Sequence, residues 1–152
     1  MKQNNHCMKP LFFFMVAVCL TGPAWLTNFN DAQDLARKEH RHILLNFSGS
    51  DWCGPCILLR KDILDQPAFL QLADSALVLV NADFPRKKKN QPSAAQQQLN
   101  DQMADRYNSR GQFPLTLLLT ADGKLLKQWE GNPGVSPEAF CAEVRAAIDE
   151  DK

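Results

Sequence analysis

The sequence predicts one α/β domain in which helices cover both faces of a central, mixed β-sheet. Two short runs, residues 43–47 and 76–82, are almost entirely apolar, as is typical of central strands that are buried on both faces. A helical pattern lies between them, so the three segments form a βαβ unit with parallel strands. Further along, Asp122 and Gly123 stand between two apolar runs and predict a hairpin, which adds antiparallel strands.

The first half of the domain supplies two helices around the first strand. Apolar residues recur at helical spacing over residues 28–39, and we expect Asn30 or Asp31 to be the N-cap. After the strand, a second helix begins at Cys53 and Cys56, where a first-turn proline is tolerated because first-turn amides need no intrahelical partner. The apolar positions that mark this second helix are Ile57, Leu58, Ile63 and Leu64.

The second half begins with the strand over residues 76–82. It leads into a polar segment, residues 83–92, which has prolines near both ends and which we expect to be exposed and mobile. The remaining predicted elements are a helix over residues 93–108, strands over 115–120 and 124–130, and a last helix that is N-capped by Ser136 and has Pro137 in its first position.

Length and charge limit the class of function. The chain has 152 residues, enough to bury a core without metals or a disulfide framework. Its 17 Lys and Arg residues balance 17 Asp and Glu residues, so there is no basic surplus for a phosphate backbone. We therefore do not expect nucleic-acid binding. We also expect the protein to be a monomer.

Residues 1–24 have the pattern of a secretory signal peptide. Lys2 and Lys9 precede an apolar run over residues 11–20, and Gly22 and Ala24 place small residues at positions −3 and −1 of a cleavage site. Cleavage near Ala24 would remove two lysines and leave 15 basic against 17 acidic side chains. We therefore expect a mature domain over residues 25–152, in the periplasm or otherwise outside the cytoplasm.

Two alternatives to cleavage stay open. The apolar run could be an uncleaved membrane anchor, although it is shorter than the ~20 residues that a spanning helix needs. The chain could also be a lipoprotein attached through Cys19, although Val18 precedes this cysteine where small residues are usual.

Cys53 and Cys56 are the candidate reactive residues. Two cysteines separated by two residues in the first turn of a helix lie close enough for a disulfide, and the helix N-terminus stabilises a thiolate. We expect Cys53 to be the more exposed, attacking thiol and Cys56 to be the deeper, resolving one. A structural disulfide would close a very short loop and add little stability. A metal site would have only Cys141, His40 and His42 as further ligands.

The sequence from Trp52 through Gly54 and Pro55 to Cys56 resembles the active site of the thioredoxin family. The resemblance extends over residues 28–148: Phe113 and Pro114 stand where the family has a cis-proline loop, and residues 84–98 look like an elaboration. It implies a thioredoxin-like fold with no cofactor beyond the Cys53–Cys56 disulfide and no metal. It also implies that Trp52, Phe113 and Pro114 contact the substrate.

The sequence departs from the family at two places. Asn46 and Leu79 stand where thioredoxin has a buried aspartate and a lysine that are linked to proton transfer at the resolving cysteine. Neither side chain titrates, so Asp51 or a water molecule could carry the proton instead. This substitution leaves the rate and the redox potential open.

The resemblance implies a thiol–disulfide oxidoreductase of the bacterial cell envelope. The Gly54–Pro55 pair favours reduction of disulfides in envelope proteins, with a membrane thiol–disulfide electron donor as the second partner. An oxidase or isomerase is one alternative, and a non-catalytic binding module with the same fold is another. Lys87, Lys88 and Lys89 could form a solvated loop, or a docking patch for acidic partners or anionic lipid headgroups. We expect Cys141 to be a core residue, and His40 and His42 to have no role.

Overall fold

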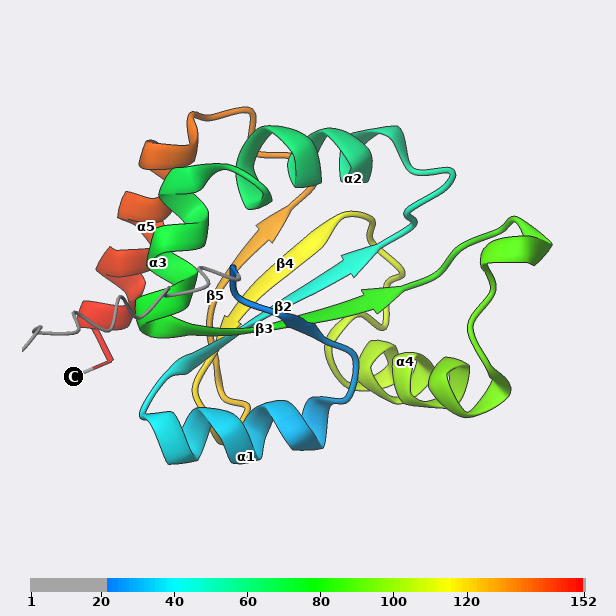
Figure 1. Cartoon of the computed structure of the whole chain (residues 1–152), viewed down its shortest axis with the longest axis horizontal. Coiled ribbons are helices and arrows are strands. Elements are labelled where there is room, and N and C mark those ends of the chain that lie inside the picture. Colours follow the sequence, from blue (N-terminus) through cyan, green and yellow to red (C-terminus); the bar gives the residue numbers. More distant parts are fainter. Residues whose placement is uncertain (1–21, 152) are drawn as a thin grey trace, which may run out of the picture.

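A mixed sheet of five strands, in the order β1-β3-β2-β4-β5, forms the centre of the molecule (Figure 1). The computed structural model describes residues 22–151, so almost all of the predicted signal peptide lies outside the described residues. Within residues 22–151, no helix is both long and apolar enough to span a bilayer.

The central strand β2 pairs in parallel with β3 and antiparallel with β4, which confirms the predicted mixed sheet. The two-residue β1 pairs in parallel with β3; it is too short to show a periodic pattern, and the sequence analysis missed it. The hairpin predicted at Asp122 and Gly123 joins β4 to β5. The strands are β1 (Trp25–Leu26), β2 (His42–Ser48), β3 (Leu77–Asp83), β4 (Leu115–Leu119) and β5 (Leu125–Glu130).

The helical segments differ from the prediction between β2 and β3. The helix that begins at the cysteines ends at Leu59 and continues as a π-helical turn, and a separate helix, missed from the sequence, leads into β3. Pro67 begins that helix, and Phe69, Leu72 and Ala73 form its buried stripe. The helices are α1 (Phe29–Glu39), α2 (Gly54–Leu59), the π-helical η1 (Arg60–Leu64), α3 (Pro67–Ala76), the 3₁₀ turn η2 (Lys88–Asn90), α4 (Ala94–Tyr107) and α5 (Pro137–Asp149).

Helices cover both faces of the sheet, as predicted (Figure 1). Because side chains alternate along a strand, Ile43, Leu45 and Phe47 of β2 face α1 and α4, whereas Leu44 faces η1, α3 and α5. Cys141 of α5 is buried in the second of these clusters, which confirms it as a core residue.

One local prediction is wrong. The N-cap of α1 is Asn28, whose Oδ1 accepts the N–H of Asn30 at 3.0 Å, rather than Asn30 or Asp31. Ile57 and Leu58, two of the apolar positions that marked the predicted helix, are 47% and 49% exposed, because only the opposite side of the short α2 faces the sheet. The Ser136 cap of α5 is confirmed: its Oγ accepts the N–H of Ala139 at 3.2 Å.

Candidate active site

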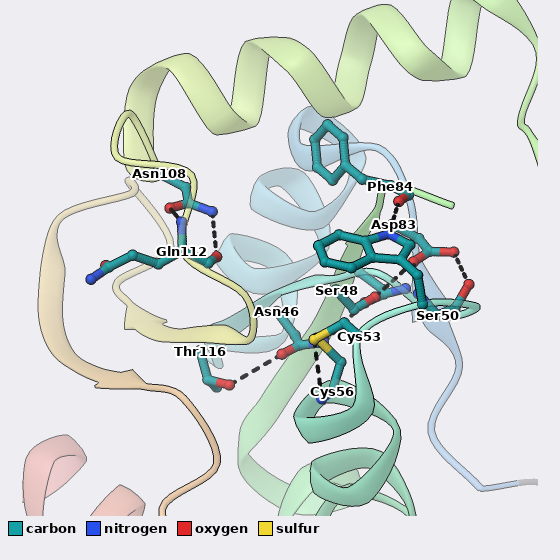
Figure 2. The surroundings of a disulfide bond; sticks show 12 residues. Asn46, Ser48, Ser50, Cys53, Cys56, Asp83, Phe84, Asn108, Gln112 and Thr116 are labelled. Carbon is teal, nitrogen blue, oxygen red and sulfur yellow. Dashed lines mark hydrogen bonds between the residues drawn. A yellow bond between two sulfur atoms is a disulfide. The ribbon is translucent and has the colours of Figure 1, made fainter. Parts of the chain in front are cut away.

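Cys53 and Cys56 form a disulfide at the start of α2. Cys53 is the N-cap residue, and its Sγ accepts the N–H of Cys56 at 3.3 Å (Figure 2). Gly54 and Pro55 form the first turn between them, as the sequence predicts. The expected difference in exposure is absent, because each cysteine is only 5% exposed in this disulfide state. The N–H that points at Sγ of Cys53 therefore distinguishes the two sulfurs better than exposure does.

The Phe113–Pro114 peptide bond is cis. Leu115 pairs with Phe47 across β4 and β2, so this bend lies at the end of the sheet where β2 leads toward Cys53. Asn108 holds the preceding loop: its Nδ2 donates to the carbonyl of Gln112, and its Oδ1 accepts the N–H of Gln112, both at 2.8 Å (Figure 2). The register and this side-chain bridge bring the predicted proline loop to the disulfide end of the sheet.

Three aromatic residues from different segments form a cluster beside the disulfide. The rings of Trp52 and Phe84 each meet Phe113 edge to face, with centroids 5.5 Å and 5.6 Å away. Nε1 of Trp52 donates to the carbonyl of Phe84 at 2.7 Å, and the Arg86 guanidinium lies over the Trp52 ring, 3.7 Å from its centroid. Gly49 is required here because a Cβ at this position would collide with the indole.

Polar side chains replace apolar ones where β2, β3 and β4 pass beneath the disulfide (Figure 2). Asn46 donates from Nδ2 to Oδ1 of Asn81 at 3.1 Å, and its own Oδ1 accepts the Thr116 hydroxyl at 3.1 Å. The Ser48 hydroxyl lies 3.2 Å from Asn81 Oδ1 and 2.9 Å from Asp83 Oδ1. We call the four neutral residues among these, Asn46, Ser48, Asn81 and Thr116, the polar layer. Its members satisfy one another, as buried polar groups require.

A cavity of about 390 Å³ opens beside Cys56 and is lined by part of the polar layer, including Asn46, Ser48 and Asn81. The space is large enough and polar enough for water to reach the resolving sulfur. Leu79, at the position of the family's lysine, is buried in the apolar cluster. Neither Asn46 nor Leu79 therefore provides a titratable group near Cys56.

Asp51 is directed at the segment that follows β3. Its Oδ1 accepts the N–H of Arg86 at 2.9 Å, and its Oδ2 accepts the N–H of Lys87 at 3.0 Å and Nδ2 of Asn90 at 2.9 Å. The hydrogen bond from the Arg86 amide, helped by the other two, lowers the pKa of the Asp51 carboxyl below its usual value. These contacts indicate that Asp51 holds the loop in place. They do not favour the proton relay that the sequence suggested for it.

The other ligand-type residues lie elsewhere. His40 caps α1 in a left-handed conformation with φ of 55°, and His42, at the far end of β2 from the disulfide, lies 3.3 Å from a carboxylate oxygen of Asp151. Burial raises the pKa of the Cys141 thiol, which suits a packing residue rather than a reactive one. Across residues 22–151, no three His, Cys, Asp or Glu side chains gather into a group that could hold a metal ion.

Sequence reasoning missed several residues of this site. Phe84 and Arg86 carry no motif, and they reach Trp52 only because the segment after β3 folds back beside the turn after β2. The joint role of Asn46 and Asn81 did leave a signal, since each is a polar residue in an otherwise apolar central strand. That signal does not say which polar residues pair.

The fold and the paired cysteines define a class of protein, and the chain belongs to the thioredoxin-like family. The sequence profile of this family matches residues 24–121. A solved thioredoxin from Thermus thermophilus superposes with a TM-score of 0.62 at 18% identity, covering 84% of this chain and 88% of that one. The predicted thioredoxin-like fold is therefore confirmed.

Within the family, the chain is similar to the disulfide bond reductase DsbH of Chlamydia pneumoniae. The two are 32% identical over 121 residues, which cover 80% of this chain and 70% of the relative. A solved structure described as DsbH oxidoreductase superposes with a TM-score of 0.76 at 28% identity, covering 98% of this chain and 95% of that one.

The polar layer predicts the effect of restoring an acid beneath the disulfide. In Asn46→Asp, burial raises the pKa of the new carboxyl above its unfolded value of about 3.9. The folded state then binds the proton more tightly than the unfolded state, so the free energy of unfolding relative to wild type falls as pH rises from 4 to 8, by about 1–3 kcal/mol. Urea unfolding at a series of pH values measures this.

The matched control is Asn30→Asp, which places the same new carboxyl on the exposed first turn of α1. Its stability should follow that of wild type over this range. An Asn46→Asp profile that is parallel to the control would contradict a buried, uncharged layer.

The contacts of Asp51 predict how the loop responds to mutation and to acid. In Asp51→Ala, protection of the Arg86 and Lys87 amides from hydrogen exchange should fall about tenfold at pH 7, because their acceptor is gone. In wild type the pKa of Asp51 is lowered, so the protection persists above the unfolded pKa and is lost as pH falls through the folded one. Asp62→Ala, which removes an exposed carboxyl on η1, is the control, and equal protection in both variants would refute the role of Asp51.

Proposed function

We propose that this protein is a thiol–disulfide oxidoreductase that reduces disulfides in proteins outside the cytoplasm through Cys53 and Cys56. The observation that carries the proposal is the disulfide at the N-cap of α2, at the same end of the sheet as the cis-proline bend. Membership of the thioredoxin-like family supports this chemistry. The similarity to a relative named disulfide bond reductase favours reduction as its direction.

The exchange has two steps that balance without a cofactor. The Cys53 thiolate attacks one sulfur of a substrate disulfide; the substrate S–S bond breaks, and the other sulfur leaves as a thiolate that takes up a proton. Cys56 then loses its proton and attacks Sγ of Cys53, which releases the second substrate thiolate and forms the Cys53–Cys56 disulfide. A membrane thiol–disulfide electron donor returns two electrons and completes the cycle.

Cys53 is proposed as the attacking residue because a negative charge is stabilised better on its sulfur than on the sulfur of Cys56. The N–H of Cys56 already points at Sγ of Cys53, and a hydrogen bond to the charged form lowers a pKa. Cys56 lines the cavity beside the polar layer. Asn46 cannot accept its proton, Asp51 is engaged with the loop, and Asp65, which also lines the cavity, is paired with Arg60. Water in that cavity is therefore the proposed acceptor.

Substrate docking is proposed along the cis-proline bend and the aromatic cluster. Pro114 itself is buried, so the contact there would use the backbone groups before it, which can pair with an extended substrate segment. Trp52 and Phe113, both half-buried, offer apolar surface beside the disulfide. This arrangement favours binding through main chain and general apolar contact rather than through one specific side chain.

Cysteine variants test the reaction. Cys53→Ser should reduce insulin no faster than buffer with dithiothreitol, because the attacking thiolate is gone. Cys56→Ser should accumulate mixed disulfides on Cys53, because the resolving thiol is missing. Cys141→Ala, which removes the buried unpaired cysteine, is the control and should keep wild-type activity.

Two outcomes would count against the proposal. Wild-type activity equal to that of Cys53→Ser would favour the hypothesis of a non-catalytic binding module. A Cys53–Cys56 potential near −120 mV in a glutathione series, as oxidising as that of dedicated oxidases, would reverse the assigned direction.

The protein is proposed to act outside the cytoplasm because residues 1–24 have the pattern of a signal peptide. Reactive dithiols in an oxidising compartment need a dedicated supply of electrons, which is why a membrane donor belongs to the proposal. N-terminal sequencing of the protein from envelope fractions should find Trp25 as the first residue. A chain that still begins at Met1 or Met8 would instead favour an anchored form.

A further inference from the structure

The segment between β3 and α4, residues 84–92, carries a dense positive charge beside the disulfide. Arg86, Lys87, Lys88 and Lys89 are consecutive and exposed, and the segment has no acidic residue. Among the residues that the structure describes, no carboxylate oxygen lies within 4.0 Å of a side-chain nitrogen of these four. We call residues 84–92 the cationic loop.

The cationic loop is held against the active-site turn. Figure 1 shows it extending from the end of β3, on the same side of the molecule as the turn that follows β2. Asp51 of that turn binds the backbone amides of Arg86 and Lys87, and Trp52 donates to the carbonyl of Phe84. Because these bonds go to the backbone, they order the loop without occupying its cationic side chains. An ordered loop loses less entropy when a ligand binds.

Arg86 connects this charge to the reactive cysteine. Its guanidinium stacks on the ring of Trp52, the residue immediately before Cys53. Stacking occupies the face of the guanidinium and leaves its edge N–H donors available for a carboxylate, which they bind in a bidentate manner. A carboxylate bound there would therefore lie beside the Trp52 indole, next to the site of exchange.

We propose that the cationic loop docks an acidic segment of the protein substrate, next to the disulfide that Cys53 attacks. The inference rests on the proposed function and adds a substrate class to it. An acidic polypeptide is favoured over anionic lipid because the charge adjoins the aromatic cluster and the cis-proline bend, where an extended chain would lie. The four consecutive cations also stand at the lower limit of the clusters that bind anionic membranes.

Peptides with one disulfide and different flanks test the selectivity. Three peptides share the same disulfide ring and carry three Glu, three Ser or three Lys residues beside it. With the purified protein and dithiothreitol, kcat/KM should be about tenfold higher for the Glu peptide than for the Lys peptide at 20 mM salt. The ratio should fall toward one at 500 mM salt, because exposed charges are screened.

Charge reversal with a matched control locates the effect. Lys88→Glu/Lys89→Glu should remove or invert the preference for the Glu peptide. Lys38→Glu/Lys124→Glu makes the same change in net charge but should keep the wild-type preference. Lys38 lies in the last turn of α1, just before β2, and Lys124 follows β4, whose last residue pairs with Ile43. Both therefore lie at the opposite end of the sheet from the disulfide.

Binding without catalysis keeps this inference separate from the proposed function. The variant Cys53→Ser/Cys56→Ser should bind the Glu peptide, with its own cysteines replaced by serine, about tenfold more tightly than the Lys peptide in calorimetry. If no peptide is turned over but this preference holds, the proposed reaction fails and the docking surface stands. Equal affinities and equal kcat/KM values for the Glu and Lys peptides would overturn the docking surface and leave the proposed reaction intact. Binding to phosphatidylglycerol vesicles without any peptide preference would overturn it in favour of a lipid site.

Discussion

Strand β2 lies between a parallel neighbour, β3, and an antiparallel neighbour, β4, and the rest of the site depends on this double pairing. The register with β3 brings the turn after β2 beside the loop after β3. The register with β4 brings the cis-proline bend to the same end of the sheet. Three segments that are remote in sequence therefore meet at the N-terminus of α2, where Cys53 and Cys56 lie. A shift of one residue in either pairing would turn the side chains of the shifted strand to the opposite face and separate the members of the polar layer.

The polar layer occupies the position where a thioredoxin would place a buried acid. Asn46 sits in the same register as Asn81 on one side and Thr116 on the other, and hydrogen bonds join all three. Burying such neutral groups is less costly than burying charges, provided that they are paired. The cavity that these side chains line together with Cys56 then gives access to solvent. Beneath the disulfide, the proposed chemistry therefore uses neutral side chains, and water takes the place of a titrating residue at position 46.

Asp51 orders the cationic loop without neutralising its charged side chains. A carboxylate near four cations would ordinarily pair with one of their side chains. Here it accepts backbone N–H groups of Arg86 and Lys87 and an amide of Asn90 instead. Trp52 acts in a similar way, since its indole N–H binds the Phe84 carbonyl while its ring supports Arg86. The turn that precedes the cysteines thus holds the surface on which we propose that acidic substrates dock.

The sequence by itself determined most of the helices and strands, the Asp122–Gly123 hairpin, the Ser136 cap, the disulfide-bearing turn and the family, because each depends on spacing within a short stretch of chain. It did not reveal β1 or α3, whose patterns are short, nor the exposure of Ile57 and Leu58. Only the tertiary structure decided the partners at the site. Asn46 meets a residue 35 positions away and another 70 positions away. Such contacts follow from strand register and packing, which no local pattern of side chains specifies.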